Sequence, residues 1–243
     1  MKSVVWAHRG ASAYFPENTI PAFQGAIDMK ADGVELDIHA SFDGKIVVSH
    51  DETLKRCGGV NVVIDSVNYD EIKRHPVPAS FKDKHPDVIA PLLSDVFELL
   101  RPHGMLINVE IKAGWSYDNI KKLIKLTHDM NMQDYVLYSS FDHRTLHAVR
   151  TLDKNCRLGA LYGGEDIPEA AQYASALRFT ELHPYYSCCR KEGYIESAKA
   201  QGLNVNPWTI NDEATIREMV KLGCHGIITN NPDIARKVID ESK

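Results

Sequence analysis

Short apolar segments and amphipathic helical patterns alternate along this sequence from end to end. Eight of the apolar segments are typical of β-strands and are each followed by a helical pattern. They begin near Val4, Val34, Leu106, Tyr135, Leu158, Leu177, Asn204 and Gly226. Eight strand–helix units in 243 residues indicate an α/β fold, the closed (β/α)₈ or TIM barrel. An open, doubly wound sheet is the alternative, but residues 8–12 lack the G-x-G-x-x-G turn that would follow its first strand.

One segment interrupts the alternation. From about Glu52 to Ile89 the periodicity is weak, and the segment contains Pro76, Pro78 and Pro86. A structureless loop of this length is uncommon inside a compact domain, so we expect a small inserted element over the barrel mouth. We therefore predict one TIM-barrel domain over residues 1–243, with an inserted subdomain at about 52–89, after the second strand region.

The overall charge argues against two classes of partner. A net charge of -5 and a pI near 6.1 are unfavourable for a general affinity for nucleic acid or anionic membranes. The apolar run Val4–Ala7 is shorter than the ~7 residues of a signal-peptide core, and no segment approaches the ~20 residues of a membrane span. Five cysteines at irregular spacings are typical of reduced thiols. We expect a cytoplasmic protein without stable membrane insertion.

Two carboxylates alternate with aliphatic residues in the segment Gly33–Ile38. If this segment is a strand, Glu35 and Asp37 share one face, where they repel each other and lose hydration unless a cation neutralises them. Glu110 ends another apolar segment, and the C-terminal ends of barrel strands meet at one rim. An all-oxygen site suits Mg²⁺ or Ca²⁺, with Mn²⁺ as a further option. A solvated ion pair of Glu110 with Lys112 is the alternative explanation for that carboxylate alone.

Two histidines and two basic residues lie at the same strand ends. His8 and His50 each follow an apolar strand, and a pair of imidazoles can serve both ends of a displacement as acid and base. The sequence leaves open which histidine takes which role. Arg9 and Lys112 suit the non-bridging oxygens of a phosphoryl group. Together these residues indicate an active site rather than a set of structural ion pairs.

The same residues lie within motifs that follow one another along nearly the whole chain. These are His8-Arg9-Gly10, Pro16-Glu17-Asn18-Thr19, residues 33–38 (GVELDI), residues 48–54 (VSHDETL), Val109-Glu110-Ile111-Lys112, Ser140-Phe141, residues 207–211 (PWTIN) and Thr229-Asn230-Asn231-Pro232. With them the sequence resembles the glycerophosphodiester phosphodiesterase family, in its bacterial cytoplasmic type. The resemblance implies a TIM barrel with a small insertion after the second strand region, and a role in lipid and glycerol metabolism.

The resemblance also implies roles for individual residues. It assigns Glu35, Asp37 and Glu110 to a divalent cation, His8 and His50 to acid–base catalysis, Arg9 and Lys112 to the phosphate, His183 and Trp208 to the substrate side, and Glu17 to support of the site. The implied reaction is the metal-dependent hydrolysis of small-molecule glycerophosphodiesters to glycerol 3-phosphate and an alcohol such as choline or ethanolamine. A lysophospholipase D-type reaction at the same site and a non-catalytic phosphate-binding barrel are the alternatives.

The sequence departs from the family pattern in two places. Residues 90–95 read APLLSD where an Ile-Pro-Thr-Leu-Glu-Glu type of sequence is more usual. Thr229-Asn230-Asn231-Pro232 replaces the usual Thr-Asp-x-Pro, which removes one carboxylate. Neither departure changes a metal or histidine position, so we expect an effect on the polarity of the rim and on substrate choice.

Overall fold

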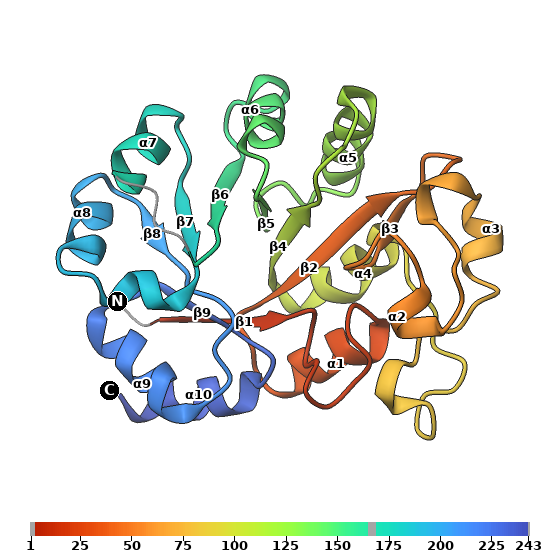
Figure 1. The fold of residues 1–243 in the computed structure, drawn as a ribbon, viewed down its shortest axis with the longest axis horizontal. Coiled ribbons are helices and arrows are strands. Elements are labelled where there is room, and N and C mark those ends of the chain that lie inside the picture. The colour runs from red at the N-terminus through yellow and green to blue at the C-terminus, as the bar shows by residue number, and fades with distance from the viewer. Residues whose placement is uncertain (1–2, 165–168, 243) are drawn as a thin grey trace.

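The computed structural model describes residues 3–164 and 169–242, and within them eight parallel strands form a nearly closed barrel with helices between them (Figure 1). The strand order around the barrel is β8-β7-β6-β5-β4-β2-β1-β9, and β3 pairs antiparallel with β2. The strands are β1 (Val4–His8), β2 (Gly33–Ala40), β3 (Ile46–Val48), β4 (Leu106–Ile111), β5 (Val136–Ser140), β6 (Arg157–Tyr162), β7 (Glu181–Pro184), β8 (Asn204–Val205) and β9 (Gly226–Thr229).

Three backbone hydrogen bonds close the ring between β9 and the segment that begins with β8. The amide of His225, just before β9, donates to the Val205 carbonyl at 2.8 Å, the Ile228 amide donates to the Pro207 carbonyl at 3.1 Å, and the Ile210 amide donates to the Ile228 carbonyl at 3.0 Å. The predicted TIM barrel is therefore confirmed, and the carboxyl ends of its strands meet at one rim.

Amphipathic helices surround the strands and bury their apolar faces against them. In α5, for example, Ile120, Leu123, Ile124 and Thr127 are buried at the spacing of one helical face, and Ser116 caps the helix by accepting from the Asn119 amide at 3.2 Å. The helices outside the insertion are α1 (Ile20–Asp28), α4 (Leu93–Leu100), α5 (Tyr117–Asp129), α6 (His143–Leu152), α7 (Ala170–Ala176), α8 (Tyr194–Ala200), α9 (Glu213–Leu222) and α10 (Pro232–Glu241), with short 3₁₀ turns η3 (Arg101–His103) and η4 (Tyr186–Arg190). None of the helices in the described ranges has the length and apolar character needed to span a bilayer.

The period-two alternation of the strands separates two environments. On β4, Ile107, Val109 and Ile111 belong to the main apolar core between strands and helices. The intervening Asn108 and Glu110 instead line a cavity inside the barrel. Polar groups of this strand thus point into the barrel, while its aliphatic residues pack between the strands and the helices.

The segment between β3 and α4 forms a separate small layer beside the barrel rim, drawn in orange and yellow in Figure 1. Its elements are α2 (Lys55–Gly58), η1 (Ile64–Ser66), α3 (Tyr69–Ile72) and η2 (Ala79–Phe81). It packs around an apolar cluster of its own, made of Val47, Leu54, Ile64, Ile72, Val77 and Ala90. The short elements explain the weak periodicity of this part of the sequence.

The strand expected to begin at Leu177 is displaced by four residues. Leu177 instead ends α7, Arg178 adopts a left-handed conformation (φ 57°), and β7 begins at Glu181. The helix predicted near Pro168–Ala174 is observed as α7, and Pro168 itself lies outside the described residues. This displacement changes the depth of His183 in the barrel, as described below.

Candidate active site

Three carboxylates meet at the rim where β2 lies beside β4. Glu35 and Asp37 project from β2, and Glu110 projects from β4 in register with Asp37. All three side chains are buried, and each offers an oxygen within 4.8 Å of the others. The structure therefore brings together the three carboxylates that the sequence singles out.

Only part of this negative charge is balanced by neighbouring cations. Lys112 Nζ lies 2.5 Å from Asp37 Oδ1 and 2.5 Å from Glu110 Oε1, and Arg9 Nε lies 3.3 Å from Asp37 Oδ2. Burial would raise the pKa of Asp37, but Lys112 and Arg9 outweigh it and hold that pKa well below its usual range. For Glu35, burial and then the charges of Asp37 and Glu110 raise the pKa well above its usual value. Burial and the charge of Asp37 likewise raise the pKa of Glu110.

The donor set fits a divalent cation. Glu35 Oε1 is buried and has no hydrogen-bond partner among the residues that the structure describes. Carboxylate oxygens are the preferred ligands of hard cations such as Mg²⁺ and Ca²⁺. A cation held by these three side chains would remove the repulsion that raises the pKa of Glu35.

The turn after β1 positions Arg9 by its backbone geometry. Arg9 (φ 56°) and Gly10 (φ 79°) are both left-handed, and a Cβ at Gly10 would lie only 2.6 Å from the backbone of Ala22. The turn allows the Arg9 amide to donate to Glu35 Oε2 at 3.1 Å. The guanidinium donates to Glu17 Oε1 at 2.9 Å, so Glu17 orients the Arg9 side chain.

The two histidines have different partners. His8 Nδ1 lies 2.6 Å from Asn230 Oδ1, and since an amide oxygen only accepts, this nitrogen carries the proton while Nε2 faces Glu35 at 3.8 Å. Burial, followed by the charge of Arg9, lowers the pKa of His8 to about 4. His50 Nδ1 instead lies 2.6 Å from the carboxylate of Asp51. One imidazole is thus oriented by a neutral amide and the other by a carboxylate.

Asn230 occupies the position where the family pattern usually has aspartate. We expected this departure to affect the polarity of the rim and substrate choice, yet Asn230 also contacts His8 directly. The expectation was incomplete because Asn230 and His8 are 222 residues apart in the sequence, and only the pairing of β9 with β1 makes them neighbours.

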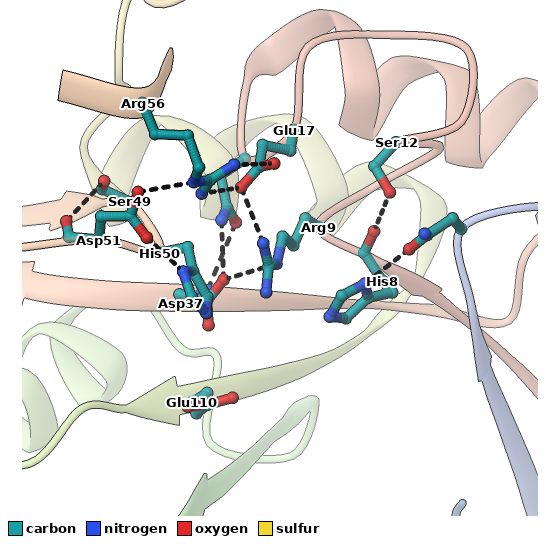
Figure 2. A network of polar contacts seen from close by, with 12 residues as sticks. His8, Arg9, Ser12, Glu17, Asp37, Ser49, His50, Asp51, Arg56 and Glu110 are labelled. Atoms are coloured by element: carbon teal, nitrogen blue, oxygen red, sulfur yellow. Dashed lines mark hydrogen bonds and ion pairs between the residues drawn. The ribbon is translucent and has the colours of Figure 1, made fainter. Parts of the chain in front are cut away.

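Arg56 is a residue of the site that the sequence analysis missed. From α2 in the insertion it donates through Nε to Asp51 Oδ2 at 2.7 Å, and through its two terminal nitrogens to Glu17 at 2.7 and 2.8 Å. Figure 2 shows this side chain between the two carboxylates, one beside His50 and the other beside Arg9. No local pattern points to Arg56, because Glu17 is 39 residues away.

The two residues implied for the substrate side lie at different depths. Trp208 lines the cavity beneath the rim, and Phe141 contacts it edge-on at 5.6 Å between ring centroids. His183 is fully buried within β7 rather than at the strand end, and it does not line this cavity. It contacts the site indirectly, because its carbonyl accepts from Trp208 Nε1 at 2.9 Å.

Two cavities open from the carboxylate cluster. An inner cavity of about 220 Å³ contains His8, Arg9, Glu35 and Trp208 in its lining. An outer groove of about 920 Å³ runs toward the insertion and is lined there by residues 50–53, Lys55 and Arg56. His50, Glu110, Lys112 and Phe141 line both spaces, so the two cavities meet at these residues.

The chain matches the model of a known family. The model of the "Glycerophosphoryl diester phosphodiesterase family" matches residues 8–234. The chain belongs to this family. The match begins at His8 and covers every carboxylate, histidine and basic residue described above.

Relatives within the family resemble the chain over its whole length. A glycerophosphodiester phosphodiesterase from Caldanaerobacter subterraneus is 37% identical over 235 residues, which are 96% of each chain. One from Bacillus altitudinis is 33% identical and covers 98% of this chain and 99% of its own. A human lysophospholipase D is 26% identical over 93% of this chain and 82% of its own.

Solved structures of the family have the same fold. A phosphodiesterase from Oleispira antarctica, in complex with the product sn-glycerol-3-phosphate, superimposes with a TM-score of 0.91 at 26% identity, covering 98% of this chain and 97% of its own. The glycerophosphodiester phosphodiesterase of Thermotoga maritima has a TM-score of 0.81 at 30% identity, covering 98% and 99%.

Proposed function

We propose that this protein hydrolyses glycerophosphodiesters to glycerol 3-phosphate and an alcohol, with a divalent cation at Glu35, Asp37 and Glu110. The observation that carries the proposal is the junction of the two cavities. There a cluster of carboxylates, two oriented imidazoles and two cationic side chains surround a space large enough for a phosphodiester. The family membership and the product bound by the Oleispira antarctica relative support the substrate class.

The cation and the basic residues would stabilise negative charge on the phosphoryl group. When bound, a divalent cation supplies Lewis-acid stabilisation of the phosphoryl oxygens as the transition state forms. Lys112 lies where the two cavities meet, and Arg9 lines the inner one, so their side chains are placed to bind the same oxygens. Mg²⁺ and Ca²⁺ are the ions that this all-oxygen donor set favours, with Mn²⁺ as a further option.

His8 and His50 would perform the proton transfers. Both line the inner cavity, and each is held through Nδ1, which leaves Nε2 available to the substrate. One imidazole takes the proton of the attacking hydroxyl and the other donates a proton to the departing alkoxide. The buried His8, with its lowered pKa, is neutral at pH 7 and suits the role of base. His50, held by Asp51 at Nδ1, would then take the role of acid.

A lysophospholipase D-type reaction is the second candidate, favoured by the human relative. Its substrates carry a long acyl chain, which needs an apolar groove at the mouth of the site. The outer groove of this chain contains Asp51, Glu52, Lys55 and Arg56 in its lining, and these charged side chains interrupt any continuous apolar surface for an acyl chain.

Product analysis with a panel of substrates tests the proposal. Metal-free protein is assayed with glycerophosphocholine, glycerophosphoethanolamine and a lysophospholipid, with chelator and after addition of Mg²⁺, Ca²⁺ or Mn²⁺. We expect glycerol 3-phosphate from the two glycerophosphodiesters only when a cation is present. Full activity in excess chelator would refute the metal assignment, and turnover of the lysophospholipid alone would favour the second candidate.

A further inference from the structure

The inner cavity is lined by two buried polar atoms that have no hydrogen-bond partner among the described residues. Ser139 on β5 and Asn108 on β4 are almost completely buried, and both line the cavity. In the described part of the chain, Ser139 Oγ and Asn108 Oδ1 have no hydrogen-bond partner. A buried polar atom without a partner is destabilising, so native proteins rarely keep one unless a ligand or water uses it.

The strand register places both groups inside the barrel, next to the carboxylates. Ser139 is the Cα partner of Glu110 across the β4–β5 ladder. Asn108 is the partner of Glu35 across the β2–β4 ladder, and it precedes Glu110 by two residues on the same face of β4. A ligand that binds at the carboxylates and extends into the barrel would therefore meet Ser139 and Asn108.

Polar atoms next to Ser139 Oγ and Asn108 Oδ1 do have partners. Ser140, the next residue on β5, has its hydroxyl satisfied because it donates to the Ile111 carbonyl at 2.7 Å. The Asn108 amide is oriented at its other end, where Nδ2 lies 3.4 Å from His183 Nδ1. The apolar Leu161 on β6, the strand next to β5, and Ile228 on β9 also line the cavity. The inner cavity thus has hydrogen-bonding groups from β4 and β5 and apolar groups from β6 and β9.

The sizes of the two cavities indicate which half of the substrate enters. His50, Glu110 and Lys112 line both spaces, so a phosphate held by them separates an inner half of the ligand from an outer half. The inner cavity of about 220 Å³ suits a short group of constant size. The outer groove of about 920 Å³ tolerates groups of different sizes. A glycerol unit, with hydroxyls on a three-carbon chain, matches the polar and apolar groups of the inner cavity.

We infer that the glycerol half of the substrate binds in the inner cavity, with its hydroxyls hydrogen-bonded to Ser139 Oγ and the Asn108 amide, and that the alcohol half lies in the outer groove. This inference rests on the proposed function for its substrate class. It assigns Ser139 and Asn108 as the residues that distinguish a glycerol ester from an ester without free hydroxyls.

Direct binding of two phosphate monoesters tests the assignment. The full-length protein is titrated calorimetrically with glycerol 3-phosphate and with propyl phosphate, which has the same carbon chain and phosphate but no hydroxyls. A hydrogen bond contributes about 0.5–1.5 kcal/mol, so we expect the unmodified protein to prefer glycerol 3-phosphate by about tenfold or more. Equal affinity for the two ligands would overturn the inference without any variant.

Three variants then locate the discrimination. Ser139→Ala and Asn108→Ala should each reduce the preference by about fivefold and leave the affinity for propyl phosphate within about twofold. Leu161→Ala is the matched control, because it enlarges the same cavity without removing a polar group and should change both affinities by the same factor. An unchanged preference in both Ser139→Ala and Asn108→Ala, or an equal loss for both ligands, would overturn the inference. Turnover of glycerophosphocholine by the unmodified protein is measured separately, so failure of the proposed function is distinguishable from failure of the subsite.

Discussion

A buried ion pair beneath the inner cavity allows a quantitative prediction of stability. Glu181 on β7 is fully buried, and the Arg157 guanidinium contacts its Oε1 at 2.5 and 3.1 Å. Asn206 Nδ2 donates to Oε2 at 2.5 Å. Burial would raise the pKa of Glu181, but the hydrogen bonds and charges of His183 and Arg157 outweigh it and lower that pKa from 4.5 to about 2. The carboxylate thus remains ionised inside the barrel because of these partners.

Arg157→Met removes the cationic partner and leaves the carboxylate behind. Breaking a buried pair in this way costs about 3–5 kcal/mol, and we take the lower end because the Arg157 side chain is 30% exposed. In a domain of this size, a loss of about 3 kcal/mol lowers Tm by roughly 6–12 °C.

Urea unfolding followed by circular dichroism measures this loss. The double variant Arg157→Met/Glu181→Gln should recover most of the stability, because it removes the charge while an amide still accepts from Asn206. Arg144→Met is the control, since Arg144 pairs with Asp142 at the surface with 92% of its side chain exposed, and its loss should leave the unfolding free energy nearly unchanged. The reasoning fails if Arg157→Met stays within about 1 kcal/mol of the unmodified protein, or if the double variant is no more stable than the single one.

The pH dependence of this effect follows from the sign of the pKa shift. Because the Glu181 pKa is lowered on folding, its stabilising contribution is complete above about pH 4.5 and is lost as the pH falls toward 2. In Arg157→Met the Glu181 carboxylate lacks its cationic partner. Protonation at low pH removes this charge and with it the cost of burying an unpaired carboxylate. The difference in unfolding free energy between the two proteins should therefore be largest near neutral pH and should shrink under acid conditions.

Three further predictions concern the site. His8→Ala and His50→Ala should each lower kcat by about 10²–10⁴ while the fold is retained by circular dichroism, and an unchanged kcat would remove that histidine from the mechanism. Replacing the centre of residues 52–89 with a short Gly/Ser linker should alter KM and the ranking of choline, ethanolamine and glycerol diesters more than metal affinity, and an unchanged ranking would make the insertion a structural cap. Arg56→Ala removes a donor to Asp51, the carboxylate that orients His50, so it should lower kcat and shift the pH–rate profile. Arg74→Ala removes a surface ion pair with Glu71 and should change neither kcat nor the profile.

The separation of functional and structural residues on the strands could be predicted from the sequence alone. Side-chain alternation along a strand is a local property, so the pattern of residues 33–38 places Glu35 and Asp37 on one face in any fold that makes this segment a strand. The barrel itself follows from the repeated strand–helix pattern. A helix between two successive strands returns the chain to the same end of the sheet, so the strands run parallel. Glu110, His8 and His50 were identified for the same reason, since each lies at the end of an apolar segment.

The depth and pairing of the remaining site residues were decided only by the tertiary structure. His183 is buried rather than at the rim because β7 begins four residues later than its pattern suggests. Arg56 joins Glu17 to Asp51 only because the insertion packs against the rim, and Asn230 meets His8 only because β9 pairs with β1. Ser139 and Ser140 are the same residue type, and only the assembled barrel gives Ser140 a partner in the Ile111 carbonyl and leaves Ser139 facing the cavity. Local patterns specify which face a side chain occupies, whereas its partners depend on barrel closure between residues far apart in the chain.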